Sequence, residues 1–164
     1  MLRFFFYGTL LDSDVRRAVF PHQAESLQIE PAALSGYRRV RAIAGGFPIL
    51  KRANGARVEG LLVEGFDRSS VLKLAHFEGS EYLPRAVRLA TRRHRGLAAW
   101  TFAAPHGRIE SREPWELRRW QLRDKPRVLR QIDRWFTDYG AGELHSFDMT
   151  HRMRRWIRDH APEA

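Results

Sequence analysis

Cysteine is absent from this chain of 164 residues. Disulfide bridges, thiolate metal ligands and catalysis by a thiol are therefore excluded. A protein without thiols fits a reducing compartment, and we expect it in the cytoplasm. The length suffices for a single domain whose hydrophobic core needs neither a disulfide nor a metal ion for stability.

Long hydrophobic runs are also missing. No apolar stretch approaches the ~20 residues that a membrane-spanning helix needs. The short aromatic run near the first residue is not followed by a small-residue cleavage site, so it does not have the form of a secretory signal. We therefore expect a soluble protein that has no visible targeting segment and no membrane partner.

Lysine is scarce although the chain is strongly basic. It supplies three of the 29 basic residues, and the formal net charge is +10. Residues 38–57 and 85–108 carry arginines without neighbouring acids. A basic surface of this kind suits phosphate binding, whereas a GC-rich coding bias gives the same arginine excess without a functional demand. Either stretch could also border a site for a carboxylate substrate.

Apolar periodicity and turn residues predict strands and helices in the first part of the chain and helices beyond residue 110. The expected elements are a strand at 2–6, a helix at 12–20, a hairpin at 49–64 that turns at Asn54-Gly55, a helix from Asp67 to Gly79, a hairpin of strands 86–91 and 97–103, and helices at 115–122, at 124–140 and after 150. Residues 27–42 alternate only loosely between apolar and polar. No internal repeat or linker divides the chain.

The first candidate site is the tetrapeptide Tyr7-Gly8-Thr9-Leu10, which follows the apolar strand at 2–6. Glycine lets the backbone turn sharply and lets another group approach its N–H closely. Short loops of this kind present N–H donors to an anionic or carbonyl oxygen. The ordinary alternative is a strand-end turn without a function.

The second candidate is Glu78, which lies between Phe77 and Gly79 at the end of an apolar helix. Burial beside an aromatic ring disfavours the charged form of a carboxylate and raises its pKa, which makes it a usable base near neutral pH. The alternative is an exposed glutamate at a helix end. Glu81, three residues later, is a rival for the same role.

Four segments occur together in the order and at the spacing of a known family. They are Tyr7-Gly8-Thr9-Leu10, Gly46-Phe47-Pro48-Ile49-Leu50, Val58-Glu59-Gly60-Leu61 and the run from Leu74 to Tyr82 with Arg85 and Val87. On these segments, over roughly residues 1–104, the chain resembles the γ-glutamylcyclotransferase-like (AIG2-like) family. The resemblance implies an α+β fold with a small mixed β-barrel, flanking helices and a cavity at the end of the first strand. Residues 105–164 would form a helical extension packed on this core within a single domain, 1–164.

The resemblance also implies an activity, namely cyclisation of a γ-glutamyl amine or peptide with release of 5-oxoproline. Glu78 takes the place of the family's general acid and base. The implied substrate-binding residues are Tyr7, Gly8, Thr9, Leu10 and Tyr82. No metal or other cofactor is needed for this chemistry, and the seven histidines show no spacing typical of metal ligands.

Three departures from the family pattern weaken the transfer of activity. Ala75 and His76 stand where the family usually has an aspartate before Phe-Glu, so a support for the glutamate is missing or is replaced by His76. Arg85 follows Tyr82 after three residues instead of two. The helical extension from about residue 110 is not explained by the core.

Two other functions therefore stay open. The same fold could serve as a non-catalytic binding module whose basic surface contacts nucleic acid, the less favoured partner, or an acidic protein. It could also carry out related acyl transfer on another γ-linked amide. The sequence leaves the oligomeric state and the identity of the leaving group open.

Overall fold

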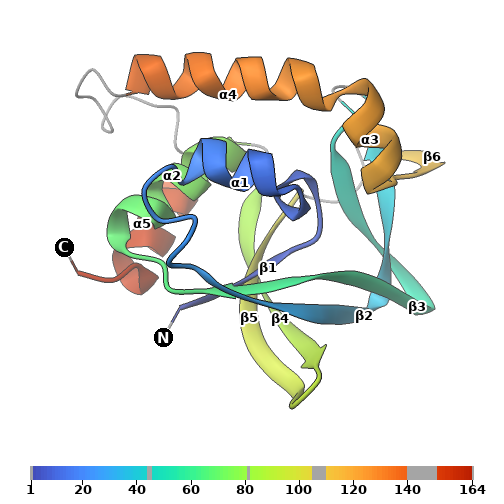
Figure 1. Ribbon diagram of the computed structural model, residues 1–164. Coiled ribbons are helices and arrows are strands. Elements are labelled where there is room, and N and C mark those ends of the chain that lie inside the picture. Colours follow the sequence, from blue (N-terminus) through green and yellow to red (C-terminus); the bar gives the residue numbers. More distant parts are fainter. Residues whose placement is uncertain (1, 44–45, 81, 105–109, 140–150, 164) are drawn as a thin grey trace.

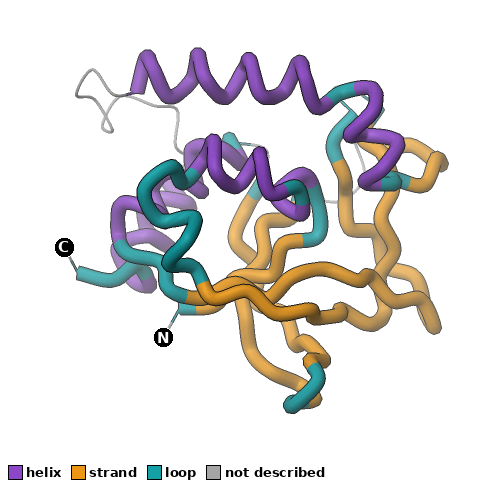
Figure 2. Tube along the Cα trace, viewed as in Figure 1, coloured by secondary structure: helices purple, strands orange, loops and turns teal. Residues whose placement is uncertain are grey.

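The computed structural model describes residues 2–43, 46–80, 82–104, 110–139 and 151–163 (Figure 1). The elements in chain order are β1 (Arg3–Phe6), a 3-10 turn η1 (Thr9–Leu11), α1 (Ser13–Val19), β2 (Gln28–Ala42), β3 (Pro48–Glu64), α2 (Arg68–Glu78), β4 (Leu83–Thr91), β5 (Arg95–Ala103), β6 (Glu110–Pro114), α3 (Leu117–Arg123), α4 (Lys125–Tyr139) and α5 (His151–His160). Figure 2 shows that the helices lie together on one side of the strands.

The strands of the described residues form a closed, mixed barrel. Their order is β3-β1-β5-β4-β2, and β2 also pairs with β3, which closes the barrel. Strands β1 and β5 are parallel, whereas the other barrel neighbours are antiparallel. Strand β6 adds to the edge of β2 outside the ring. The predicted α+β fold with a small mixed barrel and flanking helices is confirmed.

Strand β1 is buried on both faces, as its aromatic run predicted. Phe4 and Phe6 belong to the core that the strands share with the helices, whereas Phe5 and Tyr7 belong to the core inside the barrel. Side chains alternate along a strand, so one short run supplies both cores. Gly60 of β3 has no side chain because a Cβ there would clash with the carbonyl oxygen of Phe6.

The hairpin predicted at 49–64 is wrong. Strand β3 continues through Asn54-Gly55, and its partner is β2, which comes from the loosely alternating segment. Between the pairs Ser35–Arg57 and Tyr37–Arg52 the register shifts, so residues of β3 bulge out there. Gly55 has a φ of 75°, the conformation that its turn signal predicted. This local conformation forms a bulge because the long β2–β3 ladder outweighs a short hairpin.

The other predicted elements are present with small shifts in their ends. Asp12 caps α1, Asp67 caps α2 through the N–H of Ser70, and Gly79 ends α2 with a φ of 71°. Strands β4 and β5 form the predicted second hairpin. The expectation of helices alone beyond residue 110 needs one correction, because residues Glu110–Pro114 form β6. The described helices are too short or too polar to cross a membrane.

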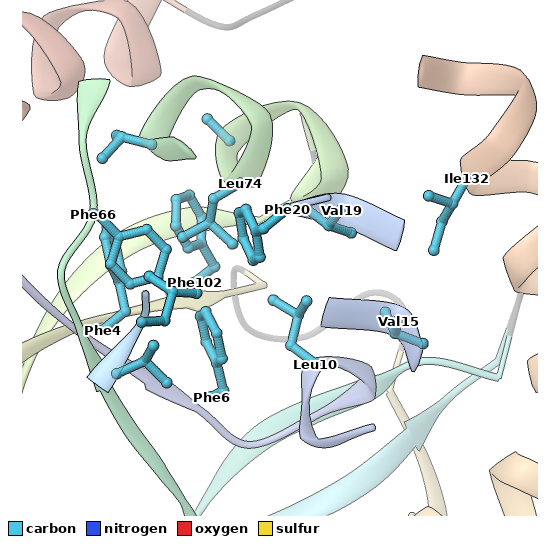
Figure 3. Packing of buried hydrophobic residues seen from close by; sticks show 14 of the residues in the cluster. Phe4, Phe6, Leu10, Val15, Val19, Phe20, Phe66, Leu74, Phe102 and Ile132 are labelled. Atoms are coloured by element: carbon cyan, nitrogen blue, oxygen red, sulfur yellow. The ribbon is translucent and has the colours of Figure 1, made fainter. Parts of the chain in front are cut away.

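The carboxyl-terminal helices share the core of the strands (Figure 1). Ile132 of α4 and Trp156 of α5 are buried in the cluster that contains Phe4. In Figure 3, Ile132 points toward Val15 and Val19 of α1, while Phe4 and Phe6 lie with Phe66 and Phe102 under α2. Helix α4 thus rests on α1 and completes the apolar core.

A buried carboxylate joins α1 to α4. Asp12 accepts hydrogen bonds from the N–H groups of Asp14 and Val15, and its Oδ2 lies 2.8 Å from both Gln121 Nε2 and Lys125 Nζ. Burial opposes its ionisation, but these hydrogen bonds outweigh burial and lower the pKa of Asp12. The carboxylate therefore stays charged at neutral pH and holds the first turn of α4 against α1.

Replacing Asp12 tests this junction. We expect Asp12→Ala to lower the free energy of unfolding at pH 7 by about 3 kcal/mol, because the change removes a helix cap and leaves Lys125 without its buried partner. Asp14→Ala is the matched control, since Asp14 also binds Lys125 but half of its side chain is exposed, and its cost should stay below about 1 kcal/mol. Urea unfolding followed by tryptophan fluorescence measures both. Equal losses of unfolding free energy in the two variants would contradict the role of Asp12 as the carboxylate that joins α1 to α4.

Candidate functional site

In the turn after β1, two carbonyl groups accept hydrogen bonds from N–H groups that follow in the same turn, whereas the first N–H groups of the turn have no such partner. The N–H of Leu11 donates to the carbonyl of Gly8 at 2.9 Å, and the N–H of Asp12 donates to that of Thr9 at 3.1 Å. The N–H groups of Gly8, Thr9 and Leu10 have no acceptor within this turn, as at any helical N-terminus. Such N–H groups favour a bound anion.

Two arginines hold the turn from its carbonyl side. Arg16 donates to the carbonyl of Leu10 at 2.8 Å and to that of Leu11 at 2.9 Å. Arg39 donates to the carbonyl of Tyr7 at 3.2 Å and lies over the Trp115 ring, 5.5 Å from its centroid. Burial lowers the pKa of both guanidinium groups from the ordinary value, yet arginine stays charged at neutral pH.

Gly8 is required by a close approach of Pro48. A Cβ at position 8 would lie 2.5 Å from Cγ of Pro48, which no ordinary contact allows. Tyr82 fixes Pro48 in turn, because its hydroxyl donates to the Pro48 carbonyl at 2.9 Å. The glycine that the sequence analysis associated with ligand approach is thus also needed for packing.

A cavity of about 70 Å³ lies beside this turn and beneath α4. All of the residues selected from the sequence line it, namely Tyr7, Gly8, Thr9, Leu10, Glu78 and Tyr82. Glu78 is the last residue of α2, where Gly79 ends the helix, and it is half-buried. The fold therefore places the end of α2 and the turn after β1 at the same small cavity.

The electrostatics of the cavity disfavour negative charge. Burial raises the pKa of Glu78 from the ordinary value, 4.5, to about 8. Burial also raises the pKa of Tyr7 well above the ordinary value, and the nearby Tyr82 and Glu78 raise it further. The Tyr7 hydroxyl donates to the carbonyl of Phe102 at 2.9 Å. Glu78 is consequently the group of this pair that can change its protonation state near neutral pH.

The basic stretches do not supply the cavity with a cation. Among the described residues that line it there is no arginine, lysine or histidine. Arg39 supports the turn from outside, and Arg85 acts on Tyr7 through its charge, lowering the Tyr7 pKa slightly against the other effects. The basic stretches, expected to border a carboxylate site, therefore act on the cavity only indirectly. Arg39 supports the turn, and Arg85 influences Tyr7.

The residues that replace the family's usual aspartate lie away from the cavity lining. Ala75 is buried in the apolar core, 3% exposed. The His76 ring packs edge-on against Phe136 of α4, with 5.6 Å between the ring centroids. Burial lowers the pKa of His76, so its ring is neutral at physiological pH. Glu81, the rival carboxylate, lies outside the described residues.

Sequence reasoning did not select Val128 and Trp135 of α4, which also line the cavity. The two residues are seven apart and so lie on one helix face. Their apolar character was visible, but it predicted only packing. No motif marks them, because their place at the cavity depends on how α4 docks on α1.

The chemistry available here is proton transfer by one carboxylate. No group of three or more potential metal-binding side chains occurs within the described segments. The walls beside Glu78 include Phe47, Phe77 and Phe102, which keep its surroundings apolar. A carboxyl group with a pKa near 8 can accept a proton as the carboxylate and donate it as the neutral acid, each at small cost near neutral pH.

The chain is similar to a known protein family in sequence and to solved structures in fold. The family model described as gamma-glutamyl cyclotransferase, AIG2-like, matches residues 4–122. This match extends beyond the barrel and includes β6 and most of α3. No curated protein sequence matches the chain.

Solved structures share the fold at low sequence identity. A protein named gamma-glutamyl cyclotransferase has 15% identity and a TM-score of 0.57, and the alignment covers 97% of this chain and 99% of that one. An AIG2-like protein from Mus musculus has 18% identity, a TM-score of 0.56 and coverages of 71% and 88%. The solution structure of a protein from Arabidopsis thaliana has 18% identity, a TM-score of 0.57 and coverages of 87% and 95%.

The family model covers more than half of the chain, and the similar structures reproduce the barrel and its helices. The chain therefore belongs to the gamma-glutamyl cyclotransferase, AIG2-like, family.

Proposed function

We propose that this protein is an enzyme of the γ-glutamyl cyclotransferase type, with Glu78 as its general acid and base. Its substrate is a γ-glutamyl amine or peptide, and its products are 5-oxoproline and the released amine or amino acid. The observation that carries the proposal is the Glu78 carboxyl group in a cavity beside the turn at 7–10, with a pKa of about 8.

The turn supplies the binding site for the glutamyl end of the substrate. The N–H groups of Gly8, Thr9 and Leu10 hold the α-carboxylate, because N–H groups at the start of a helical turn favour an anion. This arrangement suits a cavity whose described lining contains no cation. Tyr82 is the further substrate contact, since its hydroxyl oxygen can accept a hydrogen bond from the α-ammonium group.

The reaction moves two protons and needs no water molecule. Glu78 takes a proton from the α-ammonium group, and the freed nitrogen forms a bond to the γ-carbonyl carbon. The amide C–N bond then breaks as Glu78 returns this proton to the departing nitrogen. Glu78 next takes the second proton of the ring nitrogen and passes it to the released amine, so that the lactam keeps one N–H and the amine leaves as an ammonium group. The γ-carbonyl becomes the lactam carbonyl of 5-oxoproline, so all atoms of the substrate appear in the two products. One carboxyl group with a pKa near 8 serves all of these steps.

The cavity also contributes by holding the substrate in a curled conformation. An extended glutamyl chain keeps its amine away from its own γ-carbonyl, whereas a five-membered ring requires close contact of the two. Fixing this geometry makes the attack intramolecular and removes much of its entropic barrier. The rigid turn, anchored by Arg16 and Arg39, provides one end of this constraint.

Removing the carboxylate tests the assignment of Glu78. We expect Glu78→Gln to lower kcat on a panel of γ-glutamyl peptides by about 10²–10⁴-fold, because the amide cannot transfer the proton. Production of 5-oxoproline, measured by mass spectrometry, is the readout. Glu59→Gln is the matched control, since Glu59 lies on the surface in an ion pair with Arg57, and it should keep wild-type turnover. Unchanged turnover in Glu78→Gln would overturn the assignment.

The pH dependence of the wild-type reaction provides a second test. The free enzyme must carry Glu78 as a carboxylate in order to accept the proton. We therefore expect kcat/KM to rise with pH up to about 8, following the raised pKa of Glu78. Initial rates between pH 5.5 and 9, at substrate concentrations well below KM, measure this limb. A profile that is flat from pH 6 to 8 would argue against Glu78 as the base.

The same pKa predicts how stability depends on pH. The folded-state pKa of about 8 lies above the ordinary value of 4.5. The stability that the neutral Glu78 contributes is thus complete below pH 4.5 and is lost as the pH rises through 8. We expect the stability of wild type relative to Glu78→Gln to fall across this window, by at most about 1.4 kcal/mol per pH unit. Thermal melts of both proteins at pH 5 and pH 8.5 measure this difference in stability. If the two melting temperatures changed by the same amount between these pH values, Glu78 would not be a carboxyl group kept neutral by burial.

A further inference from the structure

An apolar part of the cavity lining, its apolar wall, comes from three separate parts of the chain. Helix α4 contributes Val128 and Trp135, α2 contributes Phe77, and the start of β3 contributes Pro48, preceded by Phe47. Among the described lining residues Glu78 is the acidic residue, and no basic residue is present. The polar groups of the lining thus come from the turn, Glu78, Tyr82 and Thr101, whereas α4 contributes Val128 and Trp135.

Helix α4 holds this wall in a fixed position. At its first residue, Lys125 Nζ lies 2.8 Å from Asp12 Oδ2 and 2.7 Å from Asp14 Oδ2. In the middle of the helix, Ile132 is 1% exposed and packs toward α1 (Figure 3). Phe136 contacts His76 of α2. Contacts at three points along its length make α4 a preformed part of the cavity.

Trp135 is the exposed part of the wall. It lines the cavity, and 37% of its surface remains open to solvent. An apolar group bound against its ring would remove apolar area of both partners from water. A carboxylate in the same place would lose hydration and find no cation among the described lining residues, and Glu78, the acid among them, is already engaged in the proposed reaction.

We propose that the amino compound released by this enzyme carries an apolar side chain, which packs against Trp135 and Val128 of α4. This inference rests on the proposed function, because the turn and Glu78 already account for the glutamyl end. The remaining part of the substrate must leave the reacting amide toward the open side of the cavity. Trp135 and Val128 are then specificity-determining residues for the leaving group.

A panel of γ-glutamyl dipeptides that differ only in the second side chain tests the selectivity. The panel consists of γ-glutamyl-leucine, γ-glutamyl-phenylalanine, γ-glutamyl-aspartate and γ-glutamyl-lysine, with 5-oxoproline measured by mass spectrometry. We expect kcat/KM for the leucine compound to exceed that for the aspartate compound, which is similar in size, by at least about 10-fold. Equal or better turnover of the charged compounds would overturn the selectivity while leaving the proposed function in place. Absence of 5-oxoproline from every compound would overturn the proposed function and the selectivity with it.

Substitutions at Trp135 test whether α4 is responsible. We expect Trp135→Ala to lower kcat/KM for the leucine compound by about 10-fold and to leave that for the aspartate compound nearly unchanged. Trp135→Glu should shift the preference toward the lysine compound, because it adds the missing opposite charge. Leu122→Ala, at a position on α3 that is 78% exposed, is the matched control and should keep the wild-type ratios. Wild-type ratios in both Trp135 variants, with unchanged circular dichroism, would overturn the role of α4.

Discussion

Strand β1 has no solvent-facing side along Phe4, Phe5 and Phe6, and the arrangement of both cores follows from this. One face packs with the helices and the other fills the barrel, so the strand lies at the boundary between the two. Beyond its carboxyl end, Tyr7 still packs in the barrel core and Leu10 in the core shared with the helices. The turn that follows therefore opens into a space bordered by the barrel on one side and by helices on the other. The position of the cavity is a consequence of where β1 ends.

The turn keeps its shape because its neighbours occupy its carbonyl groups. Arg16 donates hydrogen bonds to the carbonyls of Leu10 and Leu11, and Arg39 donates one to the carbonyl of Tyr7. Hydrogen bonds to a charged donor are stronger than neutral ones, so these contacts fix the backbone well. The N–H groups of Gly8, Thr9 and Leu10 lie at the start of this turn, and N–H groups in such positions favour an anion. In the proposed reaction, this rigidity would hold the substrate in its curled form.

The raised pKa of Glu78 has its origin in the fold. Gly79 ends α2 directly after Glu78, so the helix delivers the carboxyl group to the apolar space beside Phe77. Burial there costs more for the carboxylate than for the neutral acid, which moves the pKa to about 8. Helix α4 closes the same space and is itself held by the Asp12–Lys125 contact. The extension therefore shapes the surroundings of Glu78 as well as the core.

Local signals in the sequence determined much of this protein. The buried β1, the caps of α1 and α2, the β4–β5 hairpin, the helical character of α3 to α5 and the resemblance to the family all depend on residues close together in the chain. The same signals selected six residues that prove to line one cavity. These features were predictable because a cap, a turn or an alternating pattern acts over a few residues.

Only the tertiary structure decided which strands pair and what covers the cavity. The Asn54-Gly55 signal predicted the positive φ of Gly55 correctly and the strand partner wrongly, since β2 pairs with β3 through a much longer ladder. Strand β6 forms because the edge of β2 accepts it. Trp135 reaches the cavity because Lys125 and Ile132 dock α4 on α1. The strand pairing and the docking of α4 depend on contacts between segments that are distant in the chain. A pattern over a few neighbouring residues cannot predict the energies of such contacts.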